Sequence, residues 1–226
     1  MLFNYSYIIL GRITKPEKAT FTASRVLADS IPSVNKRIKK RNLLPLKLNY
    51  GSEVSGLFNS IADAVCALVF LEEELRQKGL GPVLHWSISK GLFPIIKDEN
   101  RNSIIGGKEL PALKQILIRE KSKNRFFIRT NDREDDFYLL QGLLIWDFVT
   151  EMWNLKRDKE ILTIFLDGYD YKYAADILNI ARPQAWRKYQ SMQMPAYFNI
   201  REILLSGRLT TENGGIVNSS LQINKP

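Results

Sequence analysis

The chain has 226 residues, a formal net charge of +9 and a hydrophobic fraction of 45%. This length allows one large domain or two small ones, and the hydrophobic fraction supplies a real core, which excludes wholesale disorder. The single cysteine, Cys66, excludes an internal disulfide framework and indicates a reducing compartment, so we expect a cytoplasmic protein. The longest apolar stretch, residues 137–149, is too short to cross a bilayer, and we expect no membrane partner.

The first part of the chain alternates between strand-like and helix-like patterns of apolar residues. We expect the following elements: strand 5–10, a helix from Pro16 that breaks or restarts at Pro32, strands 46–50 and 54–58 around a turn at Gly51-Ser52, helix 60–78 capped by Ser60, strand 83–89, a polar loop at 98–102, helix 111–121 and strand 125–129. The order βαββαβ predicts an α+β domain with the ferredoxin-like plan.

Residues 135–153 form a helix that is apolar on most of its circumference. One side carries Phe137, Leu140, Leu144, Phe148 and Met152, and other sides carry Leu139, Leu143, Trp146 and Trp153. Such a helix must be covered nearly all round. We therefore expect it to pack between two domains or against another subunit.

Residues 160–192 have the pattern of a helix-turn-helix. A first helix ends at Asp167-Gly168, and a second short helix spans 172–178. Asn179 follows where the tight turn needs a residue that tolerates positive φ. A third helix spans 182–192, with Pro183 in its first turn. Small residues would let two of these helices cross closely: Ala174, Ala175 and Ala185.

The third helix is expected to contact DNA. Its outward positions contain no acid, as a helix in the major groove requires, and they are Arg182, Gln184, Trp186, Arg187, Lys188 and Gln190. Two alternatives remain open. Three short amphipathic helices also pack as an ordinary bundle, and helix-turn-helix domains also serve protein contacts, for which an exposed Trp186 is suited.

The basic charge of the chain is not concentrated on this segment. Much of the excess lies in one run, namely Lys36, Arg37, Lys39, Lys40 and Arg41. No aromatic residues are interleaved with it to stack bases, so we interpret it as a solvated helix end. The predicted organisation is a ferredoxin-like domain at 1–132, an apolar connecting helix at 133–156, an all-α helix-turn-helix domain at 157–206 with a fourth helix at 196–205, and a loose tail at 207–226.

Three short motifs resemble those of the SatD family, over roughly residues 5–205. They are Leu10-Gly11-Arg12-Ile13 at the end of the first strand, Tyr50-Gly51-Ser52-Glu53-Val54-Ser55-Gly56-Leu57 in the hairpin, and Ile105-Gly106-Gly107-Lys108-Glu109-Leu110 before the next helix. The resemblance implies a palm-like or nucleotidyl-cyclase-like domain followed by a helix-turn-helix. In such palms two carboxylates at these turns hold divalent metal ions.

The chain departs from that pattern at the residues that would carry the chemistry. Arg12 and Ser52 stand where the carboxylates would be, and only Glu53 remains acidic. A guanidinium in a metal position repels the metal, so we predict no catalytic residue, no metal site and no cofactor. A residual role stays open, in which Arg12, Ser52 and Glu53 with backbone N–H groups hold an anion or a nucleotide without cleaving it.

The sequence therefore predicts a DNA-binding transcriptional regulator with a catalytically degenerate domain for sensing or dimerisation. DNA is the expected partner, and a homodimer and a nucleotide effector are left open. A nucleotide-binding or nucleotidyl-transferring enzyme of the palm type is the first alternative. A protein-interaction module that uses the helix-turn-helix for partner contacts is the second.

Overall fold

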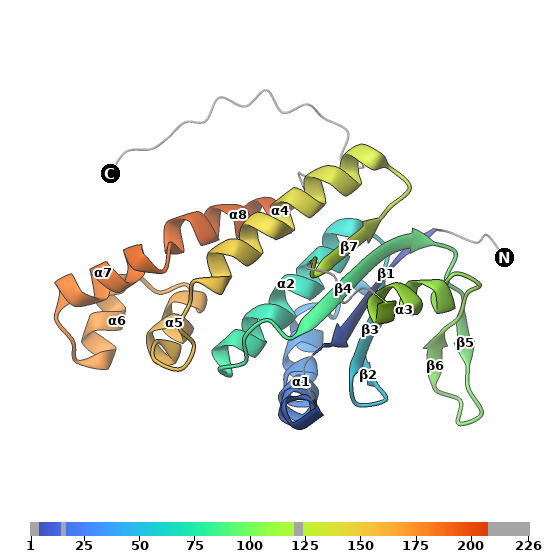
Figure 1. Cartoon of the computed structure of the whole chain (residues 1–226), viewed down its shortest axis with the longest axis horizontal. Helices are drawn as coiled ribbons and strands as arrows, with labels where there is room; N and C mark the ends of the chain where they lie inside the picture. The colour runs from blue at the N-terminus through green and yellow to red at the C-terminus, as the bar shows by residue number, and fades with distance from the viewer. Residues whose placement is uncertain (1–4, 15–16, 120–123, 208–226) are drawn as a thin grey trace.

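The computed structural model describes residues 5–14, 17–119 and 124–207 (Figure 1). Its elements in chain order are β1 (Ser6–Ile13), α1 (Glu17–Arg37), β2 (Asn42–Asn49), β3 (Glu53–Phe58), α2 (Ile61–Gln77), β4 (Leu84–Gly91), β5 (Ile95–Lys97), β6 (Ser103–Ile105), α3 (Leu110–Arg119), β7 (Phe126–Arg129), α4 (Arg133–Glu151), α5 (Lys159–Leu166), α6 (Tyr171–Leu178), α7 (Arg182–Ser191) and α8 (Met194–Ser206). The α+β class is confirmed. The predicted helix start at Pro16, the predicted end of helix 111–121 and the tail beyond residue 207 lie outside the described residues.

The main sheet has the strand order β2-β3-β1-β4-β7. β1 pairs antiparallel with β3 and β4, β2 pairs antiparallel with β3, and β7 lies parallel to β4. β5 and β6 form a separate hairpin, and the polar loop expected at 98–102 is its turn. The alternation of β1 sends Tyr7 and Ile9 into the main core and Ile8 and Leu10 into a smaller cluster under α3. Helices α1 and α2 thus cover one face of the sheet, and α3 covers part of the other (Figure 1).

Helix α1 runs through Pro32, so the predicted break at this residue is wrong. Proline lacks a backbone N–H and normally costs a helix about 3 kcal/mol. Beyond it, Val34 and Ile38 are fully buried in the main core. Because these side chains reach the core only if the helix continues past Pro32, their burial offsets the loss of one hydrogen bond.

Helix α4 contacts both β7 and α8, but only one of its faces is covered within the chain, and packing of the other face against another subunit stays a prediction. Leu139, Leu143, Trp146 and Val149 are buried against β7, α8 and neighbouring parts of the core. The opposite face is open within the chain, since Phe137, Ile145 and Phe148 are 57%, 53% and 67% exposed. The helix surrounded on most sides is instead α2, which lies between the sheet, α1, α5 and α8. None of the described helices combines the length and the apolar character needed to cross a membrane.

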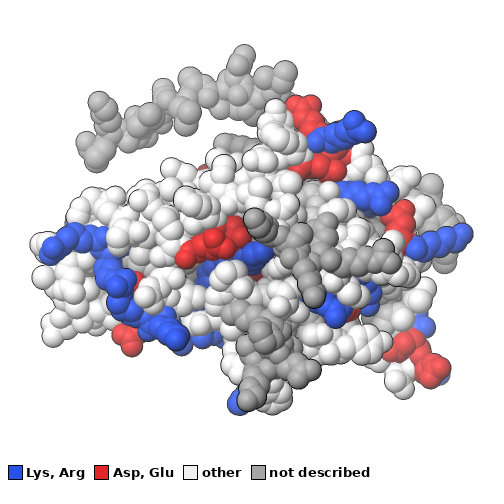
Figure 2. Space-filling model, in the orientation of Figure 1, with Lys and Arg blue, Asp and Glu red and all other residues white. Residues whose placement is uncertain are grey.

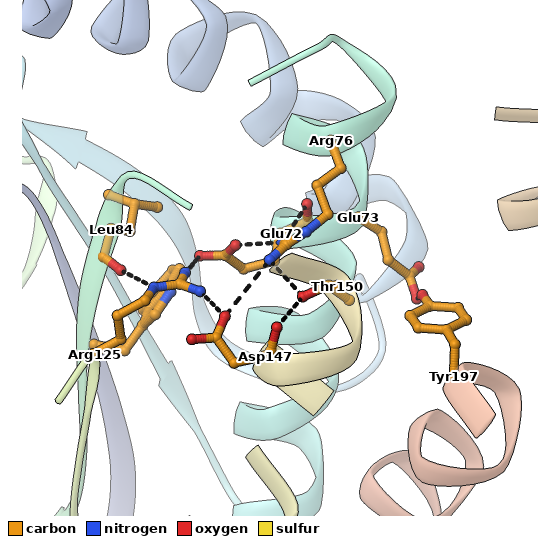
Figure 3. A network of polar contacts seen from close by, with 9 residues as sticks. Glu72, Glu73, Arg76, Leu84, Arg125, Asp147, Thr150 and Tyr197 are labelled. Carbon is orange, nitrogen blue, oxygen red and sulfur yellow. Dashed lines mark hydrogen bonds and ion pairs between the residues drawn. The ribbon is translucent and has the colours of Figure 1, made fainter. Parts of the chain in front are cut away.

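A buried ion cluster of Glu72, Arg76, Arg125 and Asp147 fixes α4 to α2 and the sheet (Figure 3). Glu72 Oε1 accepts from Trp86 Nε1 at 2.8 Å and from Arg125 Nη2 at 2.6 Å. Arg125 also donates to Asp147. Burial alone would raise the pKa of Glu72, but Arg125 and Arg76 outweigh it and hold that pKa below its ordinary value.

A second buried contact joins α2 to α8. Tyr197 Oη donates to Glu73 Oε1 at 2.6 Å, and Arg201 pairs with the same carboxylate. Burial, together with the charge of Glu73, raises the pKa of Tyr197 well above its ordinary value, so the phenol keeps its proton. Buried polar groups therefore attach both α4 and α8 to the central helix α2. In the chain, α4 precedes the α5–α7 segment and α8 follows it.

Candidate functional site

Helices α6 and α7 are joined by a turn of three residues. Asp170 caps α6 by accepting from the backbone N–H of Tyr173 at 2.8 Å. Asn179 ends α6 with φ 50° and ψ 47°, so the prediction of a left-handed residue here is confirmed. Ile180 N–H then donates back to Ala175 O at 3.0 Å. Because this Schellman-like ending reverses the chain sharply, α7 starts directly beside α6.

The crossing of these helices depends on small side chains. Ala174, Ala175 and Ala185 are all buried, as expected, and larger residues there would separate the two helices. Beneath them, Phe165 of α5 meets Tyr189 of α7 edge to face at 5.1 Å. The far end of α7 is fixed by Trp153, whose Nε1 donates to Met192 O at 2.8 Å. Helix α7 is thus held at both ends while its outer face remains open.

The outer face of α7 contains five of the six residues predicted to contact DNA. Arg182, Gln184, Trp186, Arg187 and Gln190 are exposed. Arg182 lies 3.4 Å from Asp176, an exposed contact that solvent weakens. Arg187 Nε donates to Pro183 O at 3.2 Å, within its own helix. In Figure 2 Lys and Arg side chains run along the left end of the molecule, where Figure 1 places α6 and α7.

Trp186 is only half in solvent. Its ring meets Tyr171 edge to face at 4.8 Å and stacks with Tyr189 at 6.1 Å, which leaves the side chain 44% exposed. The aromatic group of Tyr171, Trp186 and Tyr189 therefore packs α7 onto α6. This packing explains how a tryptophan is kept on an otherwise polar helix.

Lys188 differs from the other predicted residues because it faces the scaffold. Its Nζ lies 2.6 Å from Asp158 Oδ1, and Arg157 donates to both oxygens of the same carboxylate. Hydrogen bonds from Arg157 and Lys188 hold the pKa of Asp158 below its ordinary value. Lys188 thus positions α7 instead of presenting a free charge beside Arg187.

Arg12, Ser52 and Glu53 lie together at the β1–β3 end of the sheet, and the structure gives each of them a partner within the chain. Arg12 and Glu53 are opposite each other in the β1–β3 register, and their side chains form an ion pair at 2.8 Å. Lys114 from α3 takes the other carboxylate oxygen of Glu53 at 3.1 Å. Ser52 serves the turn, since its N–H donates to Asn49 O and its C=O accepts from Ile13 N–H.

Sequence reasoning missed Lys114, because nothing local connects a residue of α3 with the β2–β3 hairpin. With two cations on one carboxylate, Glu53 is poorly suited to bind a metal ion. Among the described residues, no three His, Cys, Asp or Glu side chains are placed to hold a metal ion.

Gly11, the glycine of the first resembling motif, has a packing role. A Cβ at this position would lie 2.7 Å from the Trp86 ring and 2.7 Å from Val54. The absent side chain therefore makes room for the indole that donates to Glu72. This glycine serves the buried ion cluster on one face of the sheet, while Arg12 projects on the other.

Comparison with known proteins gives weak structural similarity and nothing more. No protein-family model matches the chain, and no curated protein matches it. Among solved structures, the crystal structure of the guanylyl cyclase Cya2 matches over 55% of this chain and 74% of that chain, with a TM-score of 0.39 and 14% sequence identity. A similarity this low carries no argument about function, so the proposals below depend on the geometry of this chain.

Proposed function

We propose that the protein binds DNA through α7 and acts as a transcriptional regulator. The observation that carries the proposal is the α6–α7 pair, in which a three-residue turn and three buried alanines leave an acid-free face of α7 open to solvent. In this proposal α5, α6 and α7 are the helix-turn-helix, and α7 lies in the major groove. The order of β1 to β4 with α1 and α2 is then the ferredoxin-like plan, in a degenerate domain of the kind the SatD resemblance implies.

The exposed residues of α7 divide by chemistry. Gln184 and Gln190 carry amides that pair with adenine edges, and Arg187 carries a guanidinium suited to guanine or to phosphate. Arg182 lies near the start of α7, where the backbone N–H groups favour a phosphate. Lys188 acts indirectly by holding α7 to Asp158. The N-terminal domain has no catalytic step in this proposal, because both oxygens of Glu53 are paired with cations.

The proposal is tested by titrating a pool of random-sequence DNA duplexes, followed by the sequences enriched from it, with fluorescence anisotropy at two salt concentrations. Arg187→Gln should weaken binding and, if Arg187 contacts phosphate, reduce the slope of log K against log salt by about one unit. Lys108→Gln makes the same change of charge in the segment before α3, far from α7, and should leave binding unchanged. Failure of the wild type to bind any duplex at low salt, or equal affinities of the two variants, would contradict DNA binding through α7.

A further inference from the structure

A cavity of about 510 Å³ lies on the sheet face opposite α1 and α2, between the sheet, the β5–β6 hairpin and α3. Figure 1 places these elements at the right-hand end of the molecule, away from α7. The volume falls in the range of small-molecule sites. Its lining includes Ile8, Leu10, Leu44, Ile105, Leu110 and Leu117.

The walls of the cavity are mainly apolar, and two of its three charged lining residues, Glu53 and Lys114, lie together as an ion pair. Ile8 and Leu10 come from the face of β1 that lies opposite α1 and α2, and Leu110 and Leu117 come from α3 across the cavity. Asn49 and Ser55 also line it, and Asn49 Nδ2 donates to Ser55 Oγ at 2.8 Å. Such walls accept an apolar body and give it little polar recognition.

The charged side of the cavity has an excess of positive charge. Lys47, Lys114 and Glu53 line the cavity, and Arg12, which does not line it, pairs with Glu53 beside Lys114. Two cations share one carboxylate, so one positive charge is left without a counter-charge in this group. The Lys114 and Arg12 side chains are 34% and 32% exposed. An ammonium has three N–H donors and a guanidinium has five, so both retain donors beyond those that Glu53 accepts.

We propose that this cavity binds a small molecule with an apolar body and a single anionic group, such as a carboxylate, a sulfonate or a phosphate monoester. The body lies on Ile8, Leu10 and Leu117, and the anion accepts hydrogen bonds from Lys114 and Arg12. A nucleoside triphosphate fits less well, because its several negative charges exceed the local excess and its ribose would lie on apolar walls. The inference does not depend on DNA binding.

A matched pair of fluorescent probes separates the roles of the body and the anion. The anionic probe is 1-anilinonaphthalene-8-sulfonate, and the neutral probe is N-phenyl-1-naphthylamine, which has the same rings without the sulfonate. The full-length protein should bind one equivalent of the anionic probe more tightly than the neutral one. Lys114→Gln and Arg12→Gln should each weaken the anionic probe by roughly tenfold and leave the neutral probe unchanged, since only charge-assisted hydrogen bonds are lost. Glu53→Gln should strengthen the anionic probe by removing the competing carboxylate.

Three controls keep the test specific to the cavity. Leu44→Trp should fill the cavity and abolish binding of both probes, with circular dichroism confirming that the variant is folded. Lys108→Gln, with the same loss of charge outside the cavity, should change nothing. Phe148→Ser removes a surface aromatic residue on α4 and should also leave the one-equivalent site intact. Equal affinity for the two probes in the wild type, or binding that survives Leu44→Trp, would overturn the proposal.

Discussion

The ammonium of Lys188 lies 2.6 Å from Oδ1 of Asp158, and this ion pair joins the middle of α7 to the residue that precedes α5. Asp158 is buried, whereas the α7 residues Arg182 and Arg187 are exposed. The contact therefore adds to the buried Ala185 and to the Phe165–Tyr189 contact in holding the inner side of α7 against the rest of the chain.

Asp158→Asn should lower the stability of the protein at neutral pH. The variant should then lose less further stability than the wild type as the pH falls. The folded-state pKa of Asp158 is lowered, so its contribution is present above its ordinary value of 3.8 and is lost as the pH falls through the folded-state value. Thermal melts from pH 3 to pH 7 measure both effects. Asp176→Asn serves as the control, because its pair with Arg182 is exposed and contributes little. If the melting temperatures of the wild type and Asp158→Asn fall equally steeply with decreasing pH, the lowered pKa of Asp158 does not contribute to stability.

Glu72→Ala should destabilise the protein by about 3–5 kcal/mol, because it leaves Arg76 and Arg125 buried without their shared carboxylate. Glu74→Ala is a matched control two residues along α2. Its pair with Lys78 is more exposed and should contribute about 1 kcal/mol or less. Urea unfolding monitored by fluorescence gives both values. Similar losses in the two variants would show that the buried ion cluster is not a special determinant of stability.

The two faces of α4 should respond differently to truncation. Leu143→Ala removes a fully buried side chain and should cost about 2–5 kcal/mol through lost transfer energy and a cavity. Phe148→Ala removes a side chain that is 67% exposed, and its cost in the isolated chain should stay below about 1 kcal/mol. Denaturant titrations at low protein concentration test this. A large loss for Phe148→Ala that grows with protein concentration would instead reveal a second chain on this face.

Gly11→Ala should destabilise the protein by about 1–3 kcal/mol through overpacking, because the new Cβ meets Trp86 and Val54 at 2.7 Å. Gly81→Ala is the control, since its Cβ would meet only Leu155, at an ordinary 3.7 Å. Thermal melts compare the two. An unchanged melting temperature for Gly11→Ala would contradict the packing explanation for this glycine.

Local patterns in the sequence predicted many of the elements of the fold. Ser60 marked the start of α2 because a serine cap is a local signal, and Asn179 marked the α6–α7 turn because few residues tolerate positive φ. The β5–β6 hairpin was missed, since strands of three residues such as Ile95–Lys97 are too short to show alternation.

Long-range charge pairing could not be read from the sequence. Glu53 is held by Lys114 from another helix, and Lys188 is held by Asp158 from a distant loop. The sequence also did not show which face of α4 the rest of the chain leaves exposed. Periodicity gives the faces of a helix, but only the packing of the whole chain decides which of them are covered.

Neither the wild type nor Glu53→Gln should convert any nucleoside triphosphate, with or without Mg²⁺ or Mn²⁺. Glu53 is the one acid left in the two motifs where palms hold metal ions, and its oxygens are 2.8 Å from Arg12 and 3.1 Å from Lys114. A metal ion would have to displace both cations, and a single carboxylate then leaves Mg²⁺ dependent on its own waters. Chromatographic product analysis after prolonged incubation with each triphosphate measures this. Turnover by the wild type that disappears in Glu53→Gln would make the N-terminal domain an enzyme and would place its substrate at the charged side of the cavity.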